Sequence, residues 1–190
     1  MKAILTITVS MLLIQVGSSQ VNMTNVPSVS IKAGAFVSAQ RTFVATYGSP
    51  WFLSGVAVRF PVWERFFATG KLSYIFKSNN GYELRQWIVE VGPGYIFPVT
   101  EDFSLSVSAG LASTVFLETV PIVTSTLGNT TGSNNYGIYS AVGIERNVPS
   151  LSLSFFVEAY YSYLPREYIT TTQNFGGGEF LAGVRYNFSR

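Results

Sequence analysis

Apolar and polar residues alternate along most of the chain, which is the pattern of β-strands that bury one face. The alternation is clearest over residues 103–114, where Phe103, Leu105, Val107 and Leu111 share one face and the other carries mainly Ser and small residues. Similar segments lie at 28–40, 51–60, 66–77, 83–97, 135–147, 151–163 and 180–188. The pattern therefore predicts eight strands and an all-β fold.

The links between these segments alternate in length. Short links lie at 61–65, 98–102 and 147–150. Longer links, rich in Thr, Asn, Ser and Gly, lie at 41–50, 78–82, 117–134 and 164–178. In an antiparallel meander, alternate links lie at opposite ends of the sheet, so one end carries tight turns and the other carries loops. The spacing predicts an eight-stranded antiparallel up-and-down transmembrane β-barrel with both chain ends on the short-turn side, as in barrels of the outer membrane.

Composition bears on what surrounds this barrel. The chain of 190 residues is 47% hydrophobic and only 12% charged, against roughly 25% charged in typical soluble domains. Beyond the N-terminus it lacks the run of about 18 apolar residues that a membrane-spanning helix requires. The polar face carries mostly Ser, Gly and Ala, which suit a crowded lumen better than a surface in water. These features favour an apolar face turned to lipid over a soluble lipocalin-like barrel, which stays the alternative.

Charged residues within the strands fall on the predicted lumen side. We expect an interior charge network of Lys32, Arg59, Lys71, Glu90, Glu145, Glu158 and Arg185. An isolated buried charge is costly, so these groups must pair. Residues placed symmetrically about a hairpin loop face each other, and this predicts the pairs Lys71–Glu90 and Glu158–Arg185. The same symmetry makes Lys32 and Arg59 neighbours, with Glu145 as the available carboxylate.

Aromatic residues gather toward both ends of the predicted strands. Amphipathic rings concentrate at the two interfaces of a membrane. We expect interface aromatics of this kind at Trp51, Trp63, Trp87, Phe97, Phe103, Tyr161 and Tyr163.

The N-terminus has the form of an export signal. Lys2 precedes an apolar stretch over residues 3–16, and small residues follow up to Ser19. We expect residues 1–19 to be a signal peptide and 20–190 to be the barrel domain. Removal of 1–19 lowers the formal net charge from +2 to +1, which argues against a nucleic-acid partner.

The last strand carries a more specific signal. Gly183, Tyr186 and Phe188 form a Gly-x-x-aromatic-x-aromatic pattern near the C-terminus. With the eight-strand pattern, this resembles the small outer-membrane β-barrel proteins of Gram-negative envelopes, of OmpA/OmpX type and the porin-like families. The resemblance implies a place in the outer membrane with both termini periplasmic. It also implies outer-membrane lipid as a partner, and recognition of Gly183, Tyr186 and Phe188 by the barrel-assembly machinery.

Candidate chemistry is sparse. The chain has no His and no Cys, which removes the commonest general base, the commonest metal ligand and thiolate chemistry. We expect no enzyme activity, no metal and no cofactor. We expect a structural or surface-interaction role, with an external ligand or protein bound through loops 117–134 and 164–178. The alternatives are a narrow channel or transport-associated porin-like protein, a lipocalin-like ligand carrier, and a carboxylate-based barrel enzyme.

Overall fold

The computed structural model describes residues 26–79, 82–120, 129–168 and 171–188, so the expected signal peptide at 1–19 lies outside the described residues. The main strands are β1 (Ser28–Ser38), β2 (Trp51–Trp63), β3 (Phe66–Asn79), β4 (Tyr82–Pro98), β5 (Phe103–Val120), β6 (Asn129–Val148), β7 (Leu153–Tyr163) and β10 (Gly177–Asn187). They confirm the eight-stranded all-β prediction.

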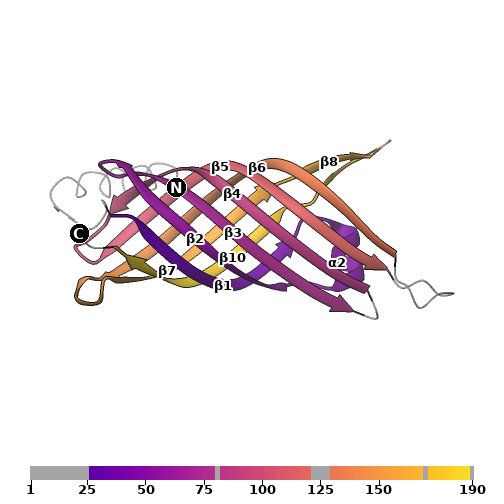
Figure 1. The fold of residues 1–190 in the computed structure, drawn as a ribbon, viewed down its shortest axis with the longest axis horizontal. Helices are drawn as coiled ribbons and strands as arrows, with labels where there is room; N and C mark the ends of the chain where they lie inside the picture. Colours follow the sequence, from indigo (N-terminus) through magenta and orange to yellow (C-terminus); the bar gives the residue numbers. More distant parts are fainter. Residues whose placement is uncertain (1–25, 80–81, 121–128, 169–170, 189–190) are drawn as a thin grey trace, which may run out of the picture.

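Every barrel strand pairs antiparallel with its neighbour in the chain, and the sheet closes on itself. The order around the barrel is β1-β10-β7-β6-β5-β4-β3-β2 (Figure 1). Closure joins the first strand to the last, with Ser28 opposite Asn187 and Ser38 opposite Gly177. The start of β1 and the end of β10 therefore lie at the same end of the barrel.

Tight connections gather at that end, which we call the short-turn end. Glu64 and Arg65 link β2 to β3, residues 99–102 link β4 to β5, and the 3-10 turn η1 (Pro149–Leu151) precedes β7. We call the opposite end the long-loop end.

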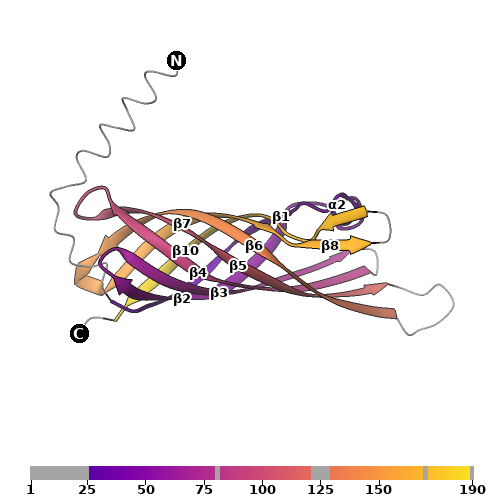
Figure 2. The same ribbon diagram turned by 90° about the horizontal axis from the view of Figure 1, so that it is seen from above.

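The long-loop end contains more regular structure than the sequence predicts. The link at 41–50 contains helix α2 (Arg41–Tyr47), and the link at 164–178 contains the ribbon of β8 (Pro165–Tyr168) and β9 (Thr171–Asn174). Strands β5 and β6 continue through most of the expected loop 117–134, whose residues 121–128 lie outside the described part. Alternation could not reveal these strand ends because polar Thr, Asn and Ser lie on both of their faces. Helix α2, the ribbon, the last residues of β5 and the first residues of β6 all lie at this end (Figures 1 and 2).

The outer face of the barrel is apolar. Its side chains expose large hydrophobic groups, among them Ile31, Val56, Leu111, Ile144, Val157 and Phe180. The intervening positions are buried inside, as the alternating burial of β1, β4 and β7 shows. In the described part of the chain, no helix has the length and apolar character needed to cross a membrane.

The interior divides along the barrel axis. Charged and hydroxyl side chains fill it from the short-turn end to the middle, as described below. Toward the long-loop end it becomes apolar, with Leu53, Ile75, Leu84 and Ile88 fully buried. Helix α2 closes this end, because Phe43 stacks on Phe116 at 5.0 Å between ring centroids. Further aromatic contacts join Tyr47, Trp51 and Phe36 into the same cluster.

Candidate functional site

A lysine between two carboxylates occupies the middle of the barrel. Lys71 Nζ lies 2.7 Å from Glu90 Oε2 and 2.6 Å from Glu179 Oε2. Lys71 on β3 is directly opposite Glu90 on β4, as hairpin symmetry predicts, while Glu179 comes from β10 across the lumen. All three side chains are buried. The predicted Lys71–Glu90 pair is thus present, and a second carboxylate shares it.

Tyr160 connects this lysine to the rest of the interior. Its ring centre lies 3.7 Å from Lys71 Nζ, a cation–π contact. Its hydroxyl accepts a hydrogen bond from Lys32 Nζ at 2.9 Å and donates one to Glu158 Oε2 at 2.9 Å. Lys32 Nζ is also 2.8 Å from Glu158 Oε2, so Lys32, Glu158 and Tyr160 form a closed triangle.

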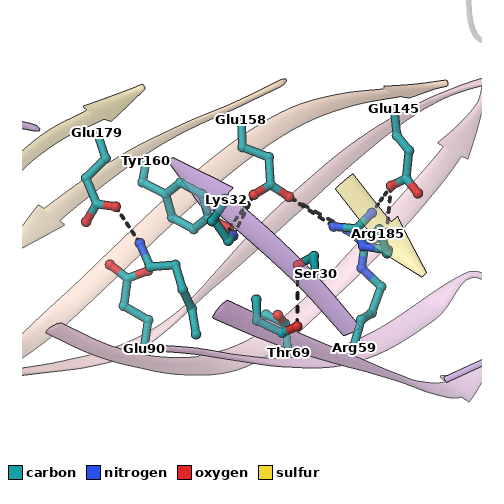
Figure 3. A network of polar contacts seen from close by, with 12 residues as sticks. Ser30, Lys32, Arg59, Thr69, Glu90, Glu145, Glu158, Tyr160, Glu179 and Arg185 are labelled. Atoms are coloured by element: carbon teal, nitrogen blue, oxygen red, sulfur yellow. Dashed lines mark hydrogen bonds and ion pairs between the residues drawn. The ribbon is translucent and has the colours of Figure 1, made fainter. Parts of the chain in front are cut away.

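Two arginines complete the network toward the short-turn end. Arg185 pairs with Glu145 and places Nη2 3.2 Å from Glu158 Oε1. Arg59 Nη1 lies 3.2 Å from Glu145 Oε2, the carboxylate expected to serve it. Figure 3 shows Glu145, Arg185, Glu158, Lys32 and Tyr160 following one another along the interior. The predicted Glu158–Arg185 pair is therefore also present, as one contact of a longer chain.

Hairpin symmetry gives the wrong register for two pairs of these residues. In the sheet Glu158 is opposite Leu181, and Arg185 is opposite Ser154, four positions away. Lys32 is likewise opposite Gly55 and not Arg59, so the two cations are not direct neighbours. The long links at 41–50 and 164–178 contain α2 and the β8–β9 ribbon, and their centres do not mark the symmetry point of the hairpin. The Glu158–Arg185 contact forms because long side chains bridge the offset.

Among the described residues, Glu179 is a further interior charge beside the seven that the sequence predicts. It is fully buried and shares the inward face of β10 with Arg185. The predicted last strand begins at Phe180, whereas β10 begins three residues earlier, at Gly177. Extending the alternation by one position would have placed Glu179 inside. We call Lys32, Arg59, Lys71, Glu90, Glu145, Glu158, Glu179 and Arg185 the interior network, which has equal numbers of cations and carboxylates.

Little free space surrounds the interior network. One cavity of about 10 Å³ touches Lys32, Glu158 and Arg185, and another of about 20 Å³ lies near Arg59 and Glu145. Each has room for about one water molecule. Within the described residues, no group of three or more metal-binding side chains comes together. The arrangement can neutralise buried charge and stiffen the barrel, but neither cavity can admit a substrate.

Helix α2 is held at the long-loop end by side-chain hydrogen bonds. The Tyr47 hydroxyl donates to Glu118 Oε1 at 2.8 Å, and Asn79 Nδ2 donates to the Thr46 carbonyl at 2.7 Å. Burial, followed by the bond to Glu118, raises the pKa of Tyr47 above its ordinary value. Gly48 ends the helix with a positive φ of 72°, which glycine adopts without strain.

Trp51 does not lie on the outer face, and its assignment as an interface aromatic is wrong. Its side chain is 1% exposed and packs inside the barrel against Phe36 and Tyr47. The distances between ring centroids are 5.5 Å and 6.2 Å. Trp51 has the same parity as inward-facing Leu53 and Arg59, whereas its neighbour Phe52 points outward and is 67% exposed.

The other expected interface aromatics lie on the outer face. Trp63, Phe97 and Phe103 lie near the short-turn end, and Trp87, Tyr161 and Tyr163 lie near the other. Phe97 packs beside Tyr95 at 4.6 Å between ring centroids. Their contact with a membrane interface stays a prediction.

The three residues of the C-terminal pattern have different surroundings. Tyr186 and Phe188 are 44% and 48% exposed, and their rings contact each other at 5.1 Å. Gly183 faces inward at the closing seam, where an added Cβ would lie 2.3 Å from the Ile31 carbonyl oxygen and 2.5 Å from the Phe156 ring. A side chain at position 183 would therefore force the closing seam to shift, whatever the part of Gly183 in recognition.

Comparison with solved structures identifies the fold. Neisserial surface protein A superimposes with a TM-score of 0.65 at 14% identity, over 85% of this chain and 97% of that one. Ail of Yersinia pestis gives a TM-score of 0.58 at 14% identity, over 86% and 99% of the two chains. The chain has the fold of the small outer-membrane β-barrels. OprG from Pseudomonas aeruginosa shares this outer-membrane barrel fold, with a TM-score of 0.58 at 8% identity over 90% and 100% of the chains.

Sequence comparisons add no nearer relative to these outer-membrane barrels. No protein-family model matches the chain, and no curated protein matches it in sequence. The outer-membrane barrel Ail has also been solved with a bound heparin analogue, sucrose octasulfate.

Proposed function

We propose that this protein is an integral outer-membrane barrel with a filled lumen, which acts as a structural or surface-interaction protein through its long-loop end. In this proposal residues 1–19 are removed on export and both termini are periplasmic. The short-turn end then faces the periplasm and the long-loop end faces the exterior, as in other barrels of this type. Outer-membrane lipid and the barrel-assembly machinery are its expected partners.

The distribution of outward-facing charge carries the proposal. Among the described barrel strands, outward charges occur at Glu83 and Arg85 near the long-loop end and at Arg146 near the short-turn end. The outward side chains between these ends are uncharged and mostly large and apolar. On β4 this uncharged stretch runs from Trp87 to Phe97, which matches the 9–11 residues that a tilted strand needs to cross the hydrocarbon.

The same distribution argues against a soluble ligand carrier. A lipocalin-type barrel keeps its interior apolar and its surface charged. Here the middle of the barrel contains the interior network, and Ile31 and Leu111 on the outer face are each 67% exposed. In water such an apolar surface would drive association of the protein with other copies, whereas in a membrane lipid chains cover it.

Two features of the interior favour a surface role over conduction. The two cavities described along the interior network measure about 10 and 20 Å³. Beyond it, Phe43 of α2 packs against Phe116 and Phe175 across the lumen. An ion would have to displace both layers, so we expect no measurable conductance in planar bilayers.

The long-loop end offers the surface for interaction. Helix α2 and the β8–β9 ribbon lie at one side of this end, and the described ends of β5 and β6 lie at its other side (Figure 2). Loops on rigid scaffolds commonly carry function. The described parts of the expected ligand segments 117–134 and 164–178 are largely β-strands, so a partner would meet paired strands where the sequence predicts loops.

Membrane fractionation followed by gel electrophoresis of unheated and boiled samples tests the proposal. The protein should stay with the outer membrane after a carbonate wash and should migrate differently before and after boiling. Release by carbonate without detergent would refute membrane integration.

A matched pair of arginine substitutions tests the lipid-facing surface directly. Leu111→Arg places a cation at mid-strand on the outer face and should cost about 2–4 kcal/mol of stability in bilayers. Val99→Arg, in a short turn, should change stability by less than about 0.5 kcal/mol. Equal, small effects at both sites would mean that the outer face is in water.

A further inference from the structure

A hollow of about 370 Å³ lies on the outer face between β1 and β4. Strands β1, β2, β3 and β4 lie side by side in Figure 1. The small side chain of Ser54 lies at its base, and Ile31, Val56, Leu72, Tyr74 and Trp87 line it. Ala33, opposite Ser54, adds a second small position. The hollow exists because small outward residues on β1 and β2 are surrounded by large ones.

The hollow lies within the span that the proposed function assigns to the outer half of the membrane. Tyr74 and Trp87 are directly opposite each other and their ring centroids are 4.3 Å apart, near the long-loop end of their strands. Such rings favour the boundary between hydrocarbon and headgroups. Ile31, Val56 and Leu72 lie on the side of this aromatic pair that faces the short-turn end, at the depth of the hydrocarbon. An occupant therefore has an apolar body at the depth of lipid chains and its head near Trp87.

A cation lies just beyond the aromatic pair. Arg85 is two residues from Trp87 on the same outward face, about 7 Å farther toward the long-loop end. Its guanidinium lies 5.9 Å from the ring centre of Phe76, and it pairs with Glu83 at 3.1 Å. Both members of that pair are well exposed, with side chains 54% and 41% accessible. Exposed ion pairs of this kind are weak, so Arg85 remains available to a phosphate.

We propose that this hollow binds one acyl chain of an anionic, phosphate-bearing membrane lipid, with the phosphate at Arg85. The inference rests on the proposed membrane location and adds a defined lipid site to it. Small outward residues let one chain lie against the barrel here, and the arginine selects an anionic headgroup over a zwitterionic one. A second copy of this protein is the competing occupant.

Trp87 provides a direct probe of the site. The protein carrying Trp63→Phe is reconstituted into phosphatidylcholine vesicles with a minor fraction of phosphatidylglycerol, and bromine atoms are placed on the chains of one lipid at a time. Bromine quenches indole fluorescence at contact, and Trp51 is shielded inside the barrel. At equal mole fraction, brominated phosphatidylglycerol should quench about two- to fivefold more than brominated phosphatidylcholine, the preference expected for one exposed charge contact.

Three variants separate the parts of the site. Arg85→Gln should abolish the preference for the anionic lipid while leaving quenching by both lipids. Ser54→Phe fills the hollow and should reduce quenching to that expected from the bulk lipid composition. Ser140→Phe makes the same change at an exposed outward serine on β6 and should alter nothing.

The outcomes distinguish this proposal from the proposed function. Heat-modifiable protein whose Trp87 is quenched in proportion to the bulk mole fraction of each lipid would overturn the lipid site but keep the membrane barrel. Trp87 shielded from both lipids, with a dimer by chemical cross-linking, would assign the hollow to a second copy. No quenching by any bilayer lipid, with release by carbonate, would overturn the membrane location itself.

Discussion

The ammonium group of Lys71 lies against the face of the Tyr160 ring, 3.7 Å from its centre. This contact joins the two parts of the interior network. On one side Lys71 bridges Glu90 and Glu179, which gives a local excess of one negative charge. On the other side Lys32 and two arginines share two carboxylates, which gives an excess of one positive charge. Tyr160 lies between these halves and contacts the lysine of each.

Substitutions at Tyr160 should separate its ring from its hydroxyl. Tyr160→Phe keeps the contact with Lys71 and removes the bonds to Lys32 and Glu158, and should lower the free energy of unfolding by about 1–3 kcal/mol. Tyr160→Leu also removes the ring and should cost about 0.5–2 kcal/mol more. Urea titration in lipid vesicles, scored by heat-modifiable gel mobility, measures both. Equal stability of the two variants would show that the ring contact contributes nothing.

The Lys71 cluster should show strong coupling between its members. Lys71→Met leaves Glu90 and Glu179 buried without their cation and should cost about 3–5 kcal/mol, the usual effect of breaking a buried pair. Adding Glu90→Gln and Glu179→Gln to Lys71→Met should restore part of that loss, because the stranded carboxylates are gone. The same urea titrations measure the coupling. If the triple variant were less stable than Lys71→Met, the cluster would not be held together by charge.

Alternation predicts the barrel strands well because each has one face in the interior and one face outside. The same alternation places seven members of the interior network correctly and, extended by one residue, also finds Glu179. The position of Trp51 near a strand end favours the membrane interface, but its parity, which it shares with Arg59, places it inside.

Helix α2 and the Arg185 contacts lay beyond pattern analysis for a different reason. Seven residues are too few for a helical repeat to stand out, and α2 is held by tertiary contacts such as Phe43–Phe116. Arg185 reaches carboxylates on two other strands, and such contacts depend on side-chain length and barrel curvature as well as on register.

Tyr47 should make the stability of the long-loop end depend on alkaline pH. Its pKa is raised in the folded protein by burial and by the hydrogen bond to Glu118. A raised pKa means that folding favours the neutral phenol, so the stabilisation is full below the unfolded value of about 10 and is lost as pH rises toward the folded value. The unfolding free energy of the parent protein should therefore fall more steeply above pH 10 than that of Tyr47→Phe.

A matched substitution controls for the other tyrosines. Tyr163→Phe removes an outward phenol whose side chain is exposed, and it should leave the alkaline slope unchanged. Hydrogen exchange of the α2 amides with increasing pH provides a local measurement of the same effect. An identical alkaline slope for the parent protein and Tyr47→Phe would contradict the prediction.

The C-terminal pattern should separate assembly in the cell from stability of the finished barrel. Phe188 is 48% exposed and contacts Tyr186 alone among the aromatic residues described. Phe188→Ala should therefore change the unfolding free energy of refolded protein by less than about 1 kcal/mol. If the barrel-assembly machinery reads this residue, the same variant should accumulate in the outer membrane to a much lower level than the parent protein.

Gly183→Ala should behave differently, because its Cβ would meet the Ile31 carbonyl and the Phe156 ring, and refolded protein should lose stability. Refolding yields in vesicles and outer-membrane levels in cells, measured for both variants, give the comparison. Normal outer-membrane levels of Phe188→Ala would remove the recognition role, while loss of refolding in both variants would show that the pattern serves closure alone.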